Sequence, residues 1–231
     1  MRLLRVLMVA TSFAALLAQP STAQEGRPFR DAWFWGVRGG VLNYSTDADL
    51  LGPSSGKGTD NAGAPMVGLD WLITRTWGGL YAGIDQSFFS ADAYYRHPSV
   101  TGDPSAQLHN LRRISLAGMA FPLQSPSLHP YLGFGFSLNQ IGDASLSNTI
   151  AIPALMTAAQ DSIQAKKVAI APMFMAGVQQ RLPNFSVFAQ GSATWLPNGY
   201  LLKAPDPKHY LQWTLEAGIR YNVGSSVDRH R

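Results

Sequence analysis

Six charged residues stand out because they fall at alternate positions within largely apolar segments. They are three arginines and three carboxylates: Arg38, Arg113, Arg220, Asp70, Asp85 and Glu216. Charges enclosed in a protein are tolerated when each is paired, whereas a solvated surface needs no such balance. If the six side chains share an interior, we expect an ion-pair network. A chance balance among six residues is the alternative.

Residue types suited to catalysis are few. His97 and Ser99, with Asp92 or Asp103, could supply a base, a nucleophile and an acid. A catalytic triad is recognised by its geometry, and the spacing indicates none, since a histidine beside a proline in a polar loop is usually solvated. The 5 histidines show no metal-ligand spacing to one another. We therefore expect no enzyme activity, no catalytic residues, no metal and no cofactor.

The charged residues lie in segments of period-two alternation, which indicates β-strands with one apolar and one polar face. The clearest segment runs from Leu211 to Val223, where every odd-numbered residue is apolar. Seven earlier segments alternate less cleanly. The eight predicted strands are 33–44, 65–73, 79–89, 111–121, 131–140, 167–181, 185–195 and 211–223.

Short and long connections alternate between these strands. Residues 74–78, 122–130 and 182–184 form short turns, whereas 45–64, 90–110, 141–166 and 196–210 are long and polar. Membrane barrels have an even number of strands, short periplasmic turns and longer outside loops. The pattern therefore predicts that both termini are periplasmic and that all four long loops lie outside.

One long connection differs from the others. Pro153 to Ala165 lacks alternation and is predicted to form a short helix, with Met156, Ala159 and Ile163 on one side. Two interpretations stay open: a loop helix that caps the barrel rim, or a lid over the path of an apolar ligand.

The N-terminus has the three regions of a secretory signal peptide. Arg2 and Arg5 precede an apolar run from Val6 to Ala18, and the small residues Ser21 and Ala23 follow. The apolar run is too short to span a bilayer as a helix; a buried N-terminal helix is the alternative. The predicted organisation is a signal peptide over 1–23, a β-barrel over 24–223 and a C-terminal tail over 224–231.

Composition narrows the class of protein further. The chain contains no cysteine, so an exported form must be stabilised by its fold or its solvent rather than by disulfides. Charged residues are 14% of the chain, below the usual level of about a quarter. Without the signal peptide the charges nearly cancel, and no basic cluster interleaves with aromatic residues, so nucleic acid is not an expected partner.

Alternation alone does not decide which face points inward. A lipocalin-type barrel is apolar inside, whereas a membrane barrel is apolar outside and must be closed. The polar face is rich in Gly, Ala and Ser, which fit the narrow interior of eight strands, and its charges balance. We therefore expect an all-β fold: an eight-stranded antiparallel up-and-down transmembrane β-barrel with a short helix in one long loop.

Aromatic residues favour the same orientation, because rings with polar tips prefer the two lipid–water interfaces. They gather near both ends of the predicted strands. One group is Trp33, Trp35, Trp77, Tyr131 and Tyr221; the other is Tyr44, Phe88, Phe89, Trp195, Tyr210 and Trp213.

The end of the last strand resembles the C-terminal signal read by the barrel-assembly machinery, in which a polar residue, a glycine, an aromatic and a hydrophobic residue are spaced as Glu216, Gly218, Tyr221 and Val223. The last position is Val rather than the commoner Phe, and a tail follows. Segments 35–40 and 130–135 also resemble strands of the small eight-stranded outer-membrane barrels of the OmpA/OmpX/OmpW type. The resemblance implies the cell outer membrane, with outer-membrane lipid and the barrel-assembly machinery as partners.

The function expected from these features is a non-enzymatic structural or surface-interaction role, with a surface partner bound through the long loops. The alternative is an OmpW-like conduit for small hydrophobic molecules that uses the 153–165 helix together with Met173 and Met175. Two further alternatives are a lipid-modifying outer-membrane enzyme and a soluble lipocalin-like periplasmic carrier.

Overall fold

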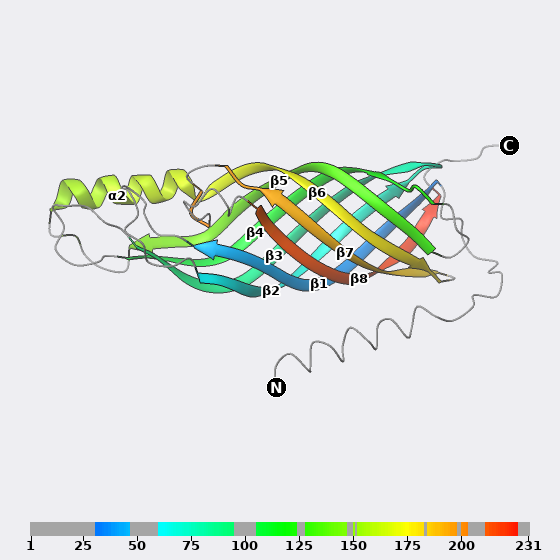
Figure 1. Ribbon diagram of the computed structural model, residues 1–231, viewed down its shortest axis with the longest axis horizontal. Helices are drawn as coiled ribbons and strands as arrows, with labels where there is room; N and C mark the ends of the chain where they lie inside the picture. The colour runs from blue at the N-terminus through cyan, green and yellow to red at the C-terminus, as the bar shows by residue number, and fades with distance from the viewer. Residues whose placement is uncertain are drawn as a thin grey trace, which may run out of the picture.

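The chain forms a closed antiparallel β-barrel in a computed structural model (Figure 1), which describes residues 31–46, 60–94, 105–123, 128–146, 150, 152–182, 184–197, 200–202 and 211–225. Each strand pairs with the next, and β1 pairs with β8 to close the ring. The predicted eight-stranded up-and-down barrel is confirmed. The strands are β1 (Ala32–Thr46), β2 (Asp60–Thr74), β3 (Gly78–Tyr94), β4 (Ser105–Ala120), β5 (Leu128–Leu146), β6 (Val168–Arg181), β7 (Phe185–Trp195) and β8 (Leu211–Ser225).

The strands are staggered around the barrel. Following paired residues from Gly39 through β2, β3, β4 and β5 leads to Val168 on β6. The opposite route through β8 and β7 leads to Val178 on the same strand, ten residues away. A stagger of this kind tilts the strands against the barrel axis, as Figure 1 shows.

Alternate side chains point into the lumen and out of the wall. On β5 the odd residues from His129 to Ile141 are buried, and the even residues between them are exposed or half-buried. The outward residues are apolar, for example Phe134 and Phe136, which are 63% and 58% exposed. An apolar face turned outward is the reverse of a lipocalin-type barrel.

Several strands are longer than predicted, and a bulge explains two of the errors. The pairing of β3 with β4 shifts register between Ser87 and Ser90. Opposite this bulge, Asn110 adopts a positive φ of 58°. The alternation therefore changes face, so that Leu108 and Leu111 are both buried although they are three residues apart. Segments 90–94 and 105–110 are strand, not loop as predicted; so are 60–64 in β2 and 141–146 in β5.

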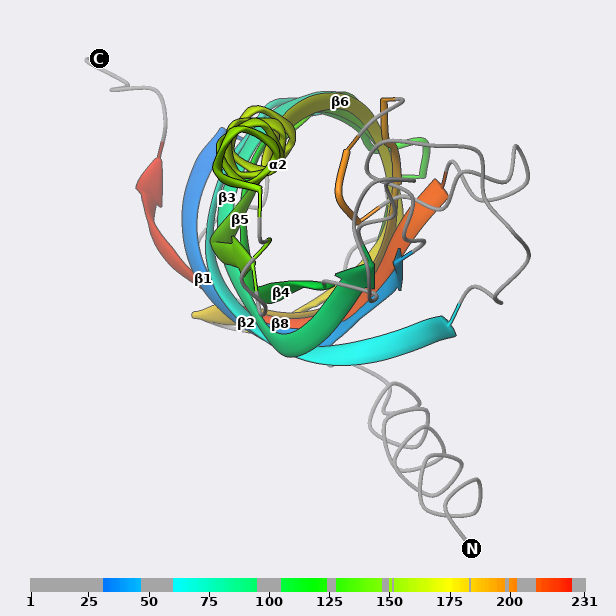
Figure 2. The same cartoon turned by 90° about the vertical axis from the view of Figure 1, so that its left-hand side faces the viewer.

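The predicted helix is present as α2 (Pro153–Lys166), which lies at the rim above β5 and β6 (Figure 2). Pro153 begins it, where a missing backbone N–H costs nothing. Ala159 and Ile163 are buried, and Met156 packs partly against them. Among the described residues, no helix is both long and apolar enough to cross a membrane.

Two aromatic residues predicted for the ends of the outer face point inward instead. Tyr131 is buried on the lumen side of β5, and Tyr44 is buried in β1, where it stacks on Phe89. Each residue falls at one of the alternate positions that face the lumen. Alternation along the strand, and not nearness to the strand end, therefore determines where each ring points. A third, Phe89, is half-buried and packs against the interior apolar cluster that contains Tyr44, so its prediction was also wrong. Tyr210 lies outside the described residues. The other predicted rings are exposed near the strand ends: Trp33, Trp35, Trp77, Tyr221, Phe88, Trp195 and Trp213.

Candidate functional site in the barrel lumen

The structure brings all six predicted charged residues together in the lumen. They come from five strands, β1, β2, β3, β4 and β8, each at an inward position. None is more than 4% exposed. We call this set of six residues the ionic layer.

One half of the ionic layer is centred on Arg113. Its guanidinium donates to Asp85 Oδ2 (Nε, 3.0 Å) and to Glu216 Oε1 (Nη2, 2.6 Å). Arg38 Nε donates to the other oxygen of Asp85 at 2.6 Å and lies 3.3 Å from Glu216 Oε2. Each carboxylate is therefore shared between two guanidinium groups, which compensates the loss of its hydration.

The other half of the ionic layer is a bidentate ion pair between Arg220 and Asp70. Arg220 donates from Nε to Asp70 Oδ1 and from Nη2 to Asp70 Oδ2, both at 3.0 Å. This fork geometry is the strongest form of an Arg–carboxylate contact. Asp70 also lies 3.5 Å from Arg38 Nη1, so it links the two halves of the layer.

Neutral side chains that the sequence did not predict complete the network. Ser192 accepts a hydrogen bond from Arg113 at 3.0 Å, and Thr214 donates to Glu216 at 2.6 Å. Gln190 donates to Glu216 at 2.8 Å and accepts from the Tyr131 hydroxyl at 2.8 Å. Gln179 accepts from Arg220 Nη1 at 2.9 Å. Their inward parity was readable from the sequence, but their ionic partners were not.

Arg220 is also enclosed by aromatic rings. Its guanidinium carbon lies 3.7 Å from the centre of the Phe188 ring, and 5.9 Å from those of Tyr81 and Tyr131. A guanidinium over a ring face gains electrostatic attraction that strengthens without water. These rings replace water around the fully buried guanidinium of Arg220.

Glycines on the inner wall leave the space that the ionic layer occupies. A Cβ at Gly36 would collide with the Asp70 carboxylate, and one at Gly68 would collide with that of Asp85. At Gly83 it would lie 2.5 Å from Arg38 Nη2. The small residues predicted for the narrow interior therefore have a specific role, which is to let long charged side chains lie flat against the wall.

Apolar clusters close the lumen on both sides of the ionic layer. Toward the turns, Phe34, Leu72, Met119 and Phe121 pack in a group that we call the turn-side cluster. Met173 and Met175 belong to this cluster, whereas α2 belongs to the other one. The structure thus separates the two parts of the predicted apolar conduit.

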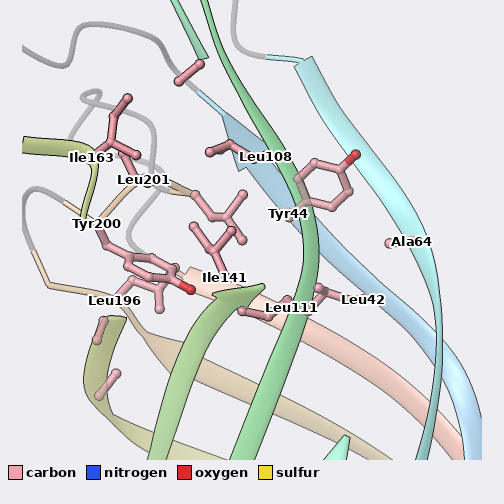
Figure 3. Close-up of a cluster of buried hydrophobic side chains, with 14 of the residues drawn as sticks. Leu42, Tyr44, Ala64, Leu108, Leu111, Ile141, Ile163, Leu196, Tyr200 and Leu201 are labelled. Carbon is pink, nitrogen blue, oxygen red and sulfur yellow. The ribbon is translucent and has the colours of Figure 1, made fainter. Parts of the chain in front are cut away.

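The second group, the helix-side cluster, includes Ile163 of α2 (Figure 3). Ile163 of α2 and Leu196, Tyr200 and Leu201 meet inward residues of β1, β4 and β5, such as Leu111. The Tyr200 hydroxyl is buried without a hydrogen-bond partner among the described residues. Burial raises the pKa of this hydroxyl above its ordinary value, so Tyr200 stays neutral.

The remaining predicted residues fall in different places. In β8, Glu216 points inward, whereas Tyr221 and Val223 are exposed on the outer face at 53% and 47%. Gly218 packs against the Phe188 ring. Asp92 falls in β3, but His97, Ser99 and Asp103 lie outside the described residues, as do segment 1–23 and most of the predicted tail. No group of described residues has the composition and proximity to hold a metal ion.

Comparison with known proteins agrees with this architecture. The sequence matches no family model and no curated protein. Among solved structures, the outer membrane protein OprG of Pseudomonas aeruginosa aligns with a TM-score of 0.52 at 13% identity, over 87% of this chain and 100% of OprG. Neisserial surface protein A aligns with a TM-score of 0.47 at 15% identity, over 81% of this chain and 96% of its own.

At these identities the likeness to OprG shows the fold alone. The chain has the architecture of the small eight-stranded outer-membrane barrels, as the sequence predicted. The ionic layer and its two apolar neighbours further define it as a barrel with a filled lumen.

Proposed function

We propose that this protein is a non-enzymatic barrel of the bacterial outer membrane with a structural or surface-interaction role. The observation that carries the proposal is the ionic layer, in which three arginines and three carboxylates are buried and mutually paired across the lumen. Eight strands enclose too little space for an aqueous pore once side chains fill it. A filled lumen leaves the outer face and the loops as the surfaces available for function.

The outer face supports a membrane location. Its apolar side chains form a continuous band, represented on β8 by Leu211, Leu215 and Ile219, which are 51%, 59% and 49% exposed. Such exposure in water would favour aggregation, whereas lipid removes that cost. Exposed Trp and Tyr rings near both edges of the band match the two lipid–water interfaces.

The two ends of the chain support a proposal for its export and assembly. We propose that segment 1–23 directs secretion and is removed, and that Glu216, Gly218, Tyr221 and Val223 are read by the barrel-assembly machinery. The inward Glu216 and the outward Tyr221 and Val223 present a polar and an apolar face on one strand.

Two measurements test the proposal. Folded membrane barrels resist SDS until heated, so the protein in the outer-membrane fraction should migrate differently before and after boiling. Reconstituted in planar bilayers, it should show negligible conductance. Steady channel openings would contradict a structural role with a filled lumen. A soluble periplasmic protein without a mobility shift would contradict the membrane location.

The helix-side cluster favours a second candidate function, a conduit for small hydrophobic molecules. This end of the lumen is lined by apolar residues rather than by charges, and α2 covers it with Ala159 and Ile163. Because the ionic layer blocks the axis below, a solute entering here would have to leave through the wall.

Deletion of residues 153–165 tests this second function in intact cells. Loss of α2 should lower the rate of uptake of a fluorescent apolar solute. Gln160→Ala, on the exposed side of α2, is the matched control and should leave uptake unchanged. Equal uptake by the deletion variant and the unaltered protein would count against the conduit.

A further inference from the structure

A groove of about 790 Å³ runs along the outer wall toward the turn end of the barrel. Its base is on β4, where the outward residues Gly118 and Ala120 are small. Leu80 on β3 pairs with Gly118 on one side, and Phe134 and Leu132 on β5 pair with Gly118 and Ala120 on the other. The groove therefore has apolar sides on both neighbouring strands.

A charged pair lies where the groove meets the turn. Arg75, which lines the groove, donates from Nη1 to Asp31 Oδ1 at 3.2 Å. The side chains are 53% and 29% exposed, unlike the fully enclosed ion pairs of the lumen. The pair therefore presents one positive and one negative group, both partly exposed, at the edge of the groove.

We propose that this groove binds one acyl chain of an aminophospholipid from the turn-side leaflet, with the lipid phosphate on Arg75 and its primary ammonium on Asp31. The proposal rests on the membrane location proposed above. A guanidinium pairs with phosphate through parallel N–H donors, and an ammonium group can donate hydrogen bonds to a carboxylate.

The charges select among lipid headgroups. Phosphatidylethanolamine carries both a phosphate and an ammonium with N–H donors. Phosphatidylcholine has no N–H to donate to Asp31, and phosphatidylglycerol has no cation at all. A site made only of Arg75 would favour any phospholipid, so Asp31 is the residue that determines specificity.

The test uses the full mature chain refolded into vesicles of equal parts phosphatidylethanolamine, phosphatidylcholine and phosphatidylglycerol. Native mass spectrometry after mild detergent extraction then counts each lipid retained per barrel. We expect phosphatidylethanolamine to exceed phosphatidylcholine about tenfold, as one charge-assisted hydrogen bond allows. Arg75→Gln should lower retention of all three lipids, whereas Asp31→Asn should abolish the preference for phosphatidylethanolamine. Asn tolerates the positive φ of 52° at this position.

Filling the groove tests the acyl chain separately from the charges. A Cβ at Gly118 would meet nothing nearer than 4.0 Å, so Gly118→Leu fits the wall and occupies the groove. Gly39→Leu adds the same side chain outside the groove, where a Cβ has a nearest contact of 3.7 Å, and is the matched control. Lipid retention should fall about tenfold in the first variant only.

Three results would overturn the inference: equal retention of the three lipids, unchanged retention by Gly118→Leu, or a dimer of the chain that retains no lipid in the mass spectrum. The heat-dependent mobility of every refolded sample separates these from failure of the proposed function. A chain that never inserts into vesicles contradicts the membrane location itself, whereas an inserted barrel without lipid preference contradicts only the site.

Discussion

Arg113 and its neighbour Arg112 show how strongly the wall determines the role of a side chain. Arg113 points into the lumen and contacts both Asp85 and Glu216, whereas Arg112 is exposed on the outer face. The two residues are adjacent and chemically identical. Their difference comes entirely from the strand alternation.

Replacement of Arg113 by Ala should destabilise the folded barrel by about 3–5 kcal/mol, because it leaves buried carboxylates without their partner. Arg112→Ala is the matched control, and it should change stability by less than about 1 kcal/mol. Urea unfolding in lipid vesicles measures both free energies. Equal losses in the two variants would mean that the ionic layer does not stabilise the fold.

The inner glycines allow a second comparison. Gly36→Ala places a methyl group against Asp70 and 2.8 Å from Arg220 Cγ, so we expect a loss of about 1–3 kcal/mol through overpacking. Gly39→Ala, which meets nothing nearer than 3.7 Å, should be within about 0.5 kcal/mol of the unaltered barrel. Urea unfolding in lipid vesicles measures the free energy of unfolding of both glycine variants. A neutral Gly36→Ala would show that the Asp70–Arg220 pair can move aside.

The charged members of the lumen could be predicted from sequence because a charge on a strand of alternating pattern has few acceptable places. Their neutral partners could not. Gln190 and Ser192 contact the network across separations of 26 and 79 residues, which depend on the register between strands. The alternation within one strand does not specify how the register adds up across several strand pairs.

At the level of elements, the sequence defined β7 and β8 well because their alternation is unbroken. It ended β3 too early and began β4 too late, because the bulge at Ser87–Ser90 changes which parity faces the lumen. The extra residues of these two strands were assigned to loops for the same reason. Alternation predicts a strand only as far as its pairing stays regular.

The docking of α2 on the barrel should depend strongly on Ile163. Ile163 is 1% exposed, whereas its neighbour Gln164 is exposed. Ile163→Asp would bury an unpaired carboxylate and should release the helix, so that trypsin cleaves after Lys166 about tenfold faster. Gln164→Asp adds the same charge on the exposed side and should leave cleavage unchanged. Heat-dependent mobility should persist in both variants, since the strands below do not require α2.

The membrane location of the whole barrel can be tested by placing one lysine at either of two depths on the outer face. Leu116, 56% exposed on β4, lies midway along the band, and Leu128 begins β5 at its turn-side edge. In lipid, Leu116→Lys should cost about 2–4 kcal/mol and Leu128→Lys about 0–1 kcal/mol. Unfolding from vesicles measures the difference. Small and equal costs would mean that water, not lipid, surrounds the wall.

The order of the buried charges along the chain affects the last step of barrel assembly, in which β8 pairs with β1. β1 to β4 carry Arg38, Asp70, Asp85 and Arg113, which already sum to zero, and β8 adds Glu216 with Arg220. The final strand therefore brings a dipole to the seam rather than a net ion. Inserting a lone charge into hydrocarbon is costly. Under the proposed membrane location, the closing strand would therefore insert with its two charges balanced.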